Sequence, residues 1–565
     1  MLDIGTISLL LLFALLFLLA IGMPLGLASA FLAVGVLYLR FGPDVLFRNF
    51  GSGPLAILSK RIYDLLTGYV LISIPLFIFM AALLERSGIA KDMYSSLNVW
   101  LSRTRGGIAI VTSIMAVIMA AMSGIIGGEV VLLGLIALPQ MLRLGYNQNL
   151  AIGTICASGS LGTMIPPSIV LIIFGLITET SIKNLFTAAF IPGFMLASLI
   201  IIYIIIRTQL DPSQAPLAEE RLTKDAARLR ALPNPTEEDT AELARREGQL
   251  AELEAQPQGR EKTALFFAFL TVLAAGFSAV LFARVAFFTV TGQNAFREGV
   301  EPIAFGTPVY LAWFGGAFVV AMALILFAFG RDRALTGWHM GKGLVPPIVV
   351  IGVVLGSIYG GITGITEAAG MGVIAVFIIS VLRGEASFEL VWDSLMRTLK
   401  STGTIIWVTI GATALAGAYT IAGGPTYVAN LIVGADLPTM GIIIVMMIIF
   451  LFMGAFMDWV GIVLLIIPVF LPIIQRLPIE EIGFLGDPLQ AKYLAVWFGV
   501  VFCMNMQVSF LSPPFGPAAF YLKSVAPPHI SLTDIFKGFL PFICIQILAL
   551  SVLLIWPPIV EILLP

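Results

Sequence analysis

The chain has 565 residues, of which 59% are hydrophobic and 11% are charged. Soluble globular proteins carry about 25% charged residues, so this composition, with a mean hydropathy of +1.02, indicates a membrane protein. The 31 Lys and Arg nearly cancel the 33 Asp and Glu, which leaves no basic surface for nucleic acid.

The apolar runs begin close to the N-terminus and continue through most of the chain. No Lys or Arg precedes Arg40, so the basic region of a cleaved signal peptide is missing and the first run is expected to be a retained helix. A spanning helix needs about 20 apolar residues, and several runs are too short or too rich in Gly and Pro to cross alone. We expect spans or half-spans near residues 5–22, 24–41, 68–86, 106–122, 129–143, 149–175, 184–206, 263–283, 308–330, 344–359, 367–383, 402–422, 440–453, 459–475, 494–510, 514–523 and 537–563.

Two polar stretches between the early spans are typical of helices that lie at the membrane surface. Lys60 and Arg61 precede an apolar run, and Arg103 and Arg105 follow Trp100. Aromatic and basic residues gather at headgroup depth. We expect interfacial amphipathic helices, which are either arms that brace a moving domain or plain connectors.

Residues 207–262 hold a third of the charges, with 9 basic and 12 acidic residues of the 64 in the chain. Two charge-rich, helix-forming stretches flank a turn that contains Pro233 and Pro235, which predicts a solvated helical hairpin. This insert is either a spacer or a docking element for a partner. Basic residues at both of its ends favour the cytoplasmic side.

The histidines and cysteines do not form a site for chemistry. Only two histidines are present, and Cys156, Cys503 and Cys544 lie in apolar runs without the spacing of a metal or redox site. The cysteines are expected to be small core residues. No GxxxxGK[ST] motif supports ATP hydrolysis, so a process at this chain would draw its energy from another source.

Three landmarks recur in the same order in the two halves of the chain. An acidic residue precedes a proline by ten positions, a Pro-Pro pair follows, and a string that begins with Ser and ends with Phe comes last. The landmarks are Glu129, Pro139, Pro166, Pro167 and residues 181–186 in the first half, and Asp458, Pro468, Pro513, Pro514 and residues 531–536 in the second. The ordered triple indicates an internal repeat.

Paired interruptions of this kind are typical of secondary transporters. Proline donates no N–H and displaces the preceding residue from helical geometry, so each pair is expected to break a membrane helix. Broken backbone is tolerated in a membrane only inside protein or beside a wet cavity. Half-helix N-termini suit a carboxylate, whereas half-helix C-termini and unwound carbonyls suit Na⁺. The breaks therefore predict a binding site.

Small polar residues around both proline pairs are candidates for that site. The alternative is helix packing, because small residues let spanning helices approach closely. Packing alone does not require consecutive prolines, which favours binding. The candidates are Ser158, Gly159, Ser160, Thr163, Pro166 and Pro167 at the first break, and Ser509, Ser512, Pro513 and Pro514 at the second.

Three isolated acids, Glu129, Glu367 and Asp458, lie in apolar surroundings. A carboxylate inside the bilayer is costly and is a functional candidate by default, although an acid at a helix N-terminus can also cap the helix. Capping and cation binding both stay open for Glu367. It belongs to a third polar group: Gly361, Thr363, Thr366 and Glu367.

With these residues placed, the sequence resembles the large membrane subunit of a tripartite ATP-independent periplasmic (TRAP) transporter. The resemblance covers roughly residues 1–207 and 344–565. It rests on MSGIIGGEVVLLGLIALPQMLRLGY, ASGSLGTMIPPSIVLIIFG, GGITGITEAAGMGV, GAFMDWVGIVLLIIPVFLPI and FLSPPFGPAAFYLKSVAP.

The resemblance implies a non-enzymatic secondary transporter of the bacterial inner membrane, without a cofactor and with Na⁺ as the coupling ion. A periplasmic binding protein would deliver a dicarboxylate or related small organic acid. The implied fold is all-α and polytopic, with two inverted repeats, re-entrant hairpins and broken helices, arranged as a scaffold and an elevator-type transport domain.

The resemblance also assigns roles to positions of this sequence. The implied hairpin tips and cation clefts fall on Ser123 and Gly124, on residues 158–167, on 361–367, on Asp458 and on 512–514. The Na⁺ ions are expected near Ser160, Thr366, Asp458 and Ser512.

The expected organisation follows the repeat. It comprises an N-terminal scaffold and amphipathic arm (1–104), the first half of the transport domain (105–207), the polar insert (208–262), two additional membrane helices (263–343), second-half scaffold helices with an arm (344–436) and the second half of the transport domain (437–565). Two extra spans are too few for a fused small subunit of about four helices, so a separate small subunit is expected as partner.

Two other readings remain open. One is the large subunit of a tripartite tricarboxylate-type transporter, which also pairs with a binding protein. The other is a proton-translocating membrane subunit, although such a subunit needs a file of intramembrane Lys, Glu and His that this sequence lacks.

Overall fold

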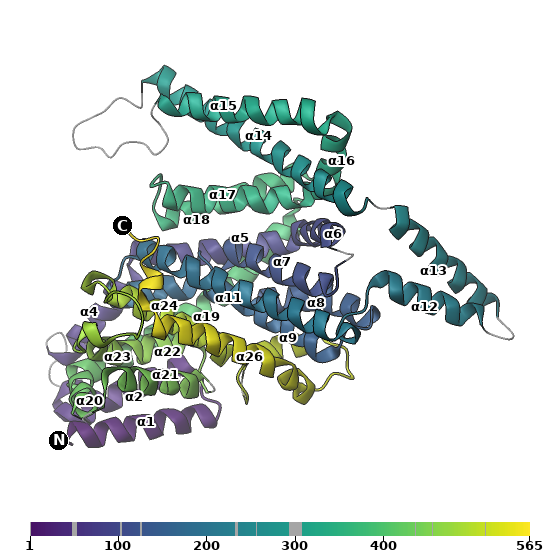
Figure 1. The fold of residues 1–565 in the computed structure, drawn as a ribbon. Coiled ribbons are helices and arrows are strands. Elements are labelled where there is room, and N and C mark those ends of the chain that lie inside the picture. Colours follow the sequence, from purple (N-terminus) through teal and green to yellow (C-terminus); the bar gives the residue numbers. More distant parts are fainter. Residues whose placement is uncertain are drawn as a thin grey trace.

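The computed structural model describes residues 2–565 apart from 48–52, 102–103, 125–126, 232–235, 256, 293–307, 435–436, 455 and 515. Every regular element in these described residues is a helix (Figure 1), which confirms the all-α expectation. The described helices that are long and apolar enough to cross a membrane number nine: Tyr69–Arg86, Ile182–Leu210, Gly259–Thr291, Val309–Phe329, Arg331–Tyr359, Ile365–Leu382, Phe388–Ile421, Ala491–Leu511 and Leu532–Ile555. The chain is therefore a multi-pass membrane protein.

The N-terminal helices pack against one long helix from the second half of the chain. α1 (Ile4–Ala20) and α2 (Leu25–Phe41) lie side by side, and α2 runs along α19 (Phe388–Ile421). A Cβ placed on Gly411 of α19 would lie only 2.0 Å from the carbonyl oxygen of Gly26. Glycine at this crossing lets the two backbones touch, as is common between membrane helices.

A second set of helices continues this body. α5 (Ser73–Arg86) packs on α19 and on α18 (Ile365–Leu382), and α17 (Val345–Tyr359) packs on α18. We call α2, α5, α17, α18 and α19 the scaffold group. It joins N-terminal helices to helices more than 250 positions later in the sequence, so only the folded chain defines it.

The two stretches expected at the membrane surface are both helical. The first is α4 (Pro54–Leu66) and the second is α6 (Ile89–Leu101). On α6, the Trp100 ring meets the Phe266 ring edge-on at 5.2 Å between centroids. Arg103 lies outside the described residues. The structure therefore confirms the helices, while their place at a membrane surface stays a prediction.

The order of elements recurs in the two halves, as the sequence repeat predicts. Each half has a helical hairpin, a helix that ends before a Pro-Pro pair, a shorter helix and a long final helix. The first half holds α7 (Gly107–Ser123), α8 (Gly128–Arg143), α9 (Gln148–Gly159), α10 (Ile169–Thr178) and α11 (Ile182–Leu210), and the second holds α21 (Thr439–Gly454), α22 (Trp459–Leu465), α23 (Ile467–Ile474), α24 (Leu494–Leu511), α25 (Pro517–Lys523) and α26 (Leu532–Ile555). The inverted relation of the repeats stays a prediction.

The recurring Ser-to-Phe strings have a local structural cause, because each starts the final helix of its half. Ser181 Oγ accepts from the Asn184 N–H at 3.3 Å at the start of α11. Ser531 Oγ accepts from the Asp534 N–H at 3.2 Å, and Asp534 Oδ2 accepts from the Ser531 N–H at 3.1 Å. The serines are N-caps that satisfy amide groups otherwise left free at a helix start.

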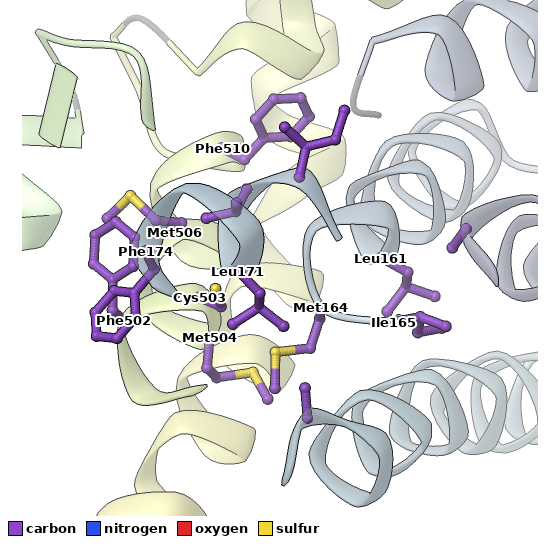
Figure 2. Close-up of a cluster of buried hydrophobic side chains, with 14 of the residues drawn as sticks. Leu161, Met164, Ile165, Leu171, Phe174, Phe502, Cys503, Met504, Met506 and Phe510 are labelled. Carbon is purple, nitrogen blue, oxygen red and sulfur yellow. The ribbon is translucent and has the colours of Figure 1, made fainter. Parts of the chain in front are cut away.

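The hydrophobic core lies between the two broken helices. Leu161 and Met164 from the first broken helix and Met504 and Met506 of α24 belong to one cluster of buried hydrophobic side chains (Figure 2). The Phe174 and Phe502 rings stack at 6.2 Å. The 18-residue window of the α24 span is 94% buried. α24 is therefore the central helix of the molecule and not a lipid-facing one.

The polar insert forms the predicted helical hairpin. α12 (Ala218–Arg230) packs on α13 (Glu237–Ala255), and the hairpin projects away from the membrane helices (Figure 1). Its expected turn, with Pro233 and Pro235, lies outside the described residues. Arg105 Nη2 bonds Glu220 Oε1 at 2.5 Å, which ties α12 to the start of α7. The insert therefore contacts the first repeat, and its membrane side stays a prediction.

The additional apolar runs form α14 (Gly259–Thr291) and α15 (Val309–Ala323), which pack against each other. Only 6% of the residues in the membrane-span window that contains α15 are buried inside the chain, so α15 keeps a large surface that can meet lipid or another chain.

One expectation about the cysteines is wrong. Cys156 and Cys503 are buried, whereas Cys544 on α26 is exposed. An apolar run predicts a membrane helix, but only packing decides which of its faces meets protein and which meets lipid.

Candidate functional site

Both proline pairs follow the end of a helix, so the predicted breaks are confirmed. After α9 the chain makes a single 3₁₀ turn, Ser160–Thr163, and the next helix starts at Ile169. In the second half α24 ends at Leu511, and α25 starts at Pro517. The missing N–H of proline prevents the helical ladder from continuing.

Side chains from the two breaks bond each other across the middle of the structure. Gln507 Nε2 donates to Thr163 Oγ1, and Gln546 Nε2 lies 3.3 Å from Ser160 Oγ. The hydroxyls of Ser113 and Ser158 are 2.8 Å apart. All of these side chains are buried. We call them the central cluster: Ser113, Ser158, Ser160, Thr163, Gln507 and Gln546.

The first hairpin brings a buried carboxylate to this cluster. Ser123 Oγ donates to Glu129 Oε1, and Glu129 is 0% exposed. A Cβ placed on Gly162 would lie 3.1 Å from both carboxylate oxygens, so Glu129 faces the 3₁₀ turn of the broken helix. Gly159 of the same segment packs on Val130. The predicted Ser123, Glu129 and Gly159 therefore lie together.

Gly124 fixes the way in which this hairpin docks. It has φ +58°, and an added Cβ would lie 2.2 Å from the carbonyl oxygen of Pro167. The tip of the first hairpin thus rests directly on the backbone of the first proline pair, where Pro166 and Pro167 are both buried. No larger residue fits at position 124 without movement.

Several buried oxygens around the cluster have no hydrogen-bond partner among the described residues: Glu129 Oε2, Thr154 Oγ1, Gln507 Oε1, Ser509 Oγ and Gln546 Oε1. Most buried polar atoms are paired, so several unpaired oxygens in one region indicate a place where a ligand or water binds. The described residues hold no group of three or more His, Cys, Asp or Glu that could bind a metal ion. Carboxylate, amide and hydroxyl oxygens instead suit a hard cation.

The second hairpin differs from the first. Asp458 is the N-cap residue of α22, without a side-chain capping bond, and it is exposed. Gly454 of this hairpin packs on Ser509. Ser512 Oγ donates to the Val508 carbonyl at 2.7 Å. Hence Asp458, the sequence equivalent of Glu129, lies in a different environment.

The second proline pair is also more open than the first. Ser512 is partly buried, and Pro513 and Pro514 are both exposed. The two pairs hold the same place in the repeat, but one is sealed inside the protein and the other is accessible.

The third polar group lies apart from the central cluster, within the scaffold group. Glu367 Oε1 accepts from the Tyr69 hydroxyl at 2.8 Å, and Thr366 Oγ1 lies 3.4 Å from the Tyr69 carbonyl oxygen. Gly361 has φ +63°, and the buried Thr363 Oγ1 has no partner among the described residues. Glu367 occupies the first turn of α18, which fits the capping alternative.

Four residues that the structure places at the site were not predicted from the sequence: Ser113, Gln507, Gln546 and Tyr521. Gln546 joins the central cluster, and Gln507 links the repeats. Both are amide side chains inside apolar spans, and this polarity could have identified them as candidates from the sequence. Tyr521 gave no such signal: its ring covers Gly127 of the first hairpin and stacks on Phe510 of α24 at 6.2 Å. Tyr521 therefore links the first hairpin to α24.

The bond between the two breaks can be measured by a double-mutant cycle. We expect Thr163→Val and Gln507→Leu to couple by about 0.5–2 kcal/mol in the free energy of unfolding, since they remove two halves of one buried hydrogen bond. Denaturant unfolding of the purified protein in detergent measures this value. Pairing Gln507→Leu with Thr178→Val, whose hydroxyl bonds Thr180 instead, should be additive within about 0.5 kcal/mol. Equal coupling energies in the Thr163/Gln507 and Thr178/Gln507 cycles would contradict the hydrogen bond between Thr163 and Gln507.

Comparison with known proteins finds a family whose model matches most of this chain. Residues 12–559 match the family model described as "Tripartite ATP-independent periplasmic transporter, DctM component". A C4-dicarboxylate TRAP transporter large permease protein of Pseudomonas aeruginosa is 33% identical over 166 residues, which are 29% of this chain and 39% of that protein. The match to this relative thus spans well under half of its length.

Longer matches have lower identity. The ectoine/5-hydroxyectoine TRAP transporter large permease protein of Ruegeria pomeroyi is 24% identical over 514 residues, 90% of this chain and 89% of that protein. The isethionate TRAP transporter permease protein of Oleidesulfovibrio alaskensis is 22% identical over 506 residues, 89% of this chain and 59% of that protein. These longer matches cover most of this chain, so the similarity is not confined to one half.

Proposed function

The chain belongs to the family of tripartite ATP-independent periplasmic transporter DctM components, and from this premise we propose that it is the large permease subunit that moves a small organic acid across the membrane, driven by a Na⁺ gradient. The relatives' names include C4-dicarboxylate, ectoine and isethionate transporters. A small, charged, organic solute is common to these names. A dicarboxylate or related acid is the substrate class that we propose.

The observation that carries this proposal is the meeting of the two breaks at Thr163 and Gln507. The two helices end at matched proline pairs and are bonded to each other here, and the unwound backbone of the first break lies in the protein interior. Such backbone persists in a membrane protein only where it is buried or lines a cavity. Half-helix ends at this point offer free N–H and C=O groups for an acid and for cations.

Na⁺ coupling draws its support from the unpaired oxygens. Glu129 Oε2, Gln507 Oε1 and Ser509 Oγ are buried without a partner among the described residues. We propose that a Na⁺ ion is held by this group. The other expected cation positions differ in support. Asp458 is an exposed residue without a side-chain capping bond. The Ser160, Thr366 and Ser512 hydroxyls already bond backbone carbonyls.

The packing suggests how the transporter would move. The scaffold group holds α19, which contacts both α2 and α5 over long stretches, while each repeat is built around its own hairpin and broken helix. We propose that residues 105–207 and 437–565 form an elevator-type transport domain, carried by scaffold segments 1–104 and 344–436. Residues 208–262 and 263–343 would be the insert and the added membrane helices.

The proposed assembly has two further proteins. A small membrane subunit of about four helices would bind in the bacterial inner membrane, and a periplasmic protein would deliver the acid. The isethionate relative is named DctMQ, and the match covers only 59% of its length, so that protein has a further region outside the match. The exposed α15 surface provides one face on which a separate small subunit could pack.

Uptake by the reconstituted complex tests the proposal. Liposomes that hold this chain and its small subunit, supplied with the binding protein, should accumulate an organic acid under an inward Na⁺ gradient and not under an equal K⁺ gradient. Equal uptake with both gradients would refute Na⁺ coupling, and no uptake of any acid would refute the substrate class.

Asp458→Asn should lower the Na⁺-driven uptake rate by at least about tenfold, since a cation site loses its charge, worth more than about 1.4 kcal/mol. Asp487→Asn provides the control, because Asp487 is also an exposed aspartate but lies in the loop before α24. We expect control uptake at the wild-type rate. Matching losses in both variants would remove Asp458 from the mechanism.

A further inference from the structure

A cavity of about 550 Å³ lies between the first hairpin and the scaffold group. Its polar wall is formed by Glu85, Arg86, Gly127, Gly128, Arg397 and Tyr521. Apolar residues of α5 and α8, among them Ile78 and Leu132, complete it. Ligand pockets of about 300–1,000 Å³ hold small molecules, so the volume fits a small organic acid.

Arg397 and Glu85 form an ion pair at the wall of this cavity. Arg397 Nη1 donates to Glu85 Oε2. The guanidinium has five N–H donors, and among the described residues no other acceptor is recorded for it. Its side chain is 40% exposed, whereas that of Glu85 is 11% exposed. The arginine therefore has donors to spare on the cavity side, while its glutamate partner is largely enclosed.

The pair lies directly against the start of α8. A Cβ placed on Gly128 would lie 2.4 Å from Glu85 Oε1 and 2.7 Å from Arg397 Nη2. The first N–H groups of a helix lack intrahelical acceptors and carry a partial positive charge. The Glu85 carboxylate thus sits between a scaffold arginine and the first turn of the helix that carries Glu129.

We propose that this cavity binds the carboxylate group of the transported acid, with Arg397 as the recognising residue and Glu85 as an internal carboxylate that the substrate displaces. This inference rests on the proposed function and names the residues that select its substrate class. Arginine matches a carboxylate in a bidentate arrangement, and Glu85 already shows that a carboxylate fits at this point.

The rest of the lining suits such a ligand. Arg86 adds a second cation beside the cavity, paired with Asp393 at 2.5 Å. The hydroxyls of Ser401 and Tyr521 are further donors on the wall, and the α5 and α8 side chains face the carbon skeleton. A dicarboxylate can therefore reach two arginines, whereas an uncharged analogue would leave both without a ligand anion.

The position also links binding to movement. Glu85 and Arg397 belong to the scaffold group, but Gly127, Gly128 and Tyr521 belong to the two repeats. A substrate carboxylate between them would replace the direct contact of Glu85 with the α8 start. The bound acid would then take part in the contact between the two bodies.

The competing explanation is an ordinary ion pair that only fastens α5 to α19. The two explanations differ in the direction in which two substitutions shift the half-saturating acid concentration. If Arg397 recognises substrate, Arg397→Gln should raise the half-saturating acid concentration by roughly 10–100-fold, and Arg397→Lys should raise it less. Glu85→Gln should lower that concentration several-fold, because the internal competitor loses its charge. If the pair is purely structural, both Gln variants should raise the half-saturating acid concentration.

The experiment uses the complete complex of this chain with its small subunit. A panel of mono- and dicarboxylates and their amides is tested for thermal stabilisation of the detergent-purified complex and for uptake into liposomes. Arg105→Gln is the matched control, since it removes an arginine from an ion pair with Glu220, outside the cavity, and it should bind as wild type does. We expect stabilisation by at least one acid, by none of the amides, and its loss in Arg397→Gln.

The possible outcomes distinguish this inference from the proposed function. Stabilisation by no acid, or stabilisation retained in Arg397→Gln, overturns the carboxylate site even if uptake is normal. Acid-dependent stabilisation that Arg397→Gln abolishes supports the site, and absent Na⁺-driven uptake in the same preparation would overturn only the proposed transport. Weakening by Glu85→Gln equal to that by Arg397→Gln overturns the displacement.

Discussion

Replacing Gly124 with alanine is expected to undock the first hairpin and to abolish most uptake. Gly124 has φ +58°, a conformation that costs an alanine about 1–2 kcal/mol. The new methyl group would also lie 2.2 Å from the Pro167 carbonyl oxygen, which is backbone and cannot rotate away. Overpacking of this kind typically adds about 1–3 kcal/mol. Thermal unfolding in detergent and uptake into liposomes measure the two consequences.

Gly384→Ala isolates the steric part of this effect. Gly384 has a similar φ of +72°, but a Cβ there meets nothing within 4 Å. We expect this control to lose only the stability that corresponds to the conformational cost, and to keep its uptake. If Gly124→Ala were no less stable than Gly384→Ala, the hairpin would not be docked on Pro167 as described.

Glu129→Gln is expected to leave the protein folded and to reduce Na⁺-driven uptake by at least about tenfold, equal to about 1.4 kcal/mol. The amide keeps an oxygen that can accept from Ser123, so the hairpin retains its internal hydrogen bond. The charge that would hold a cation beside Gly162 is removed. A carboxylate that is fully buried with an unpaired oxygen is costly to retain, which supports a functional reason for its presence.

Two further variants complete this test. Glu480→Gln makes the same chemical change at an exposed position in the loop after α23, and its uptake should equal that of the wild type. Ser123→Ala should destabilise the protein by about 1–3 kcal/mol, because it leaves both carboxylate oxygens unpaired. Normal Na⁺ dependence in Glu129→Gln would assign Glu129 to hairpin structure alone.

The two halves of the chain are similar in sequence landmarks and unlike in exposure. Glu129 is 0% exposed and faces the first broken helix, whereas Asp458 is exposed at the tip of the second hairpin. The first proline pair is buried, and the second is exposed. In the elevator-type mechanism that we propose, one gate is sealed while the other is accessible, and the two proline pairs differ in this way.

The central cluster shows how far residue type alone could lead. Ser158, Ser160 and Thr163 were identifiable because small hydroxyl residues next to Pro-Pro stand out in an apolar span. Their partners Gln507 and Gln546 lie 344 and 386 positions later than the residues they bond. Spacing along the chain carries no information on such pairs.

Glu367 illustrates the opposite case. Its sequence surroundings matched those of the other acids, but it bonds Tyr69 at the start of the α5 span and lies outside the central cluster. Arg397 and Glu85 gave no signal at all, because a charged residue near a helix end is ordinary in sequence. They became a candidate site only when packing placed them beside Gly128 and a cavity.

The sequence by itself determined that this is an all-helical membrane protein with two matched sets of broken helices and a polar hairpin insert. Those conclusions follow from composition, from apolar runs and from the local effect of proline and serine on the backbone. The tertiary structure alone decided which acid is buried, which cysteine faces outward and which scaffold residues meet the hairpins. Each of these depends on contacts between segments hundreds of positions apart, whose pairing is set by packing and not by any local preference of the chain.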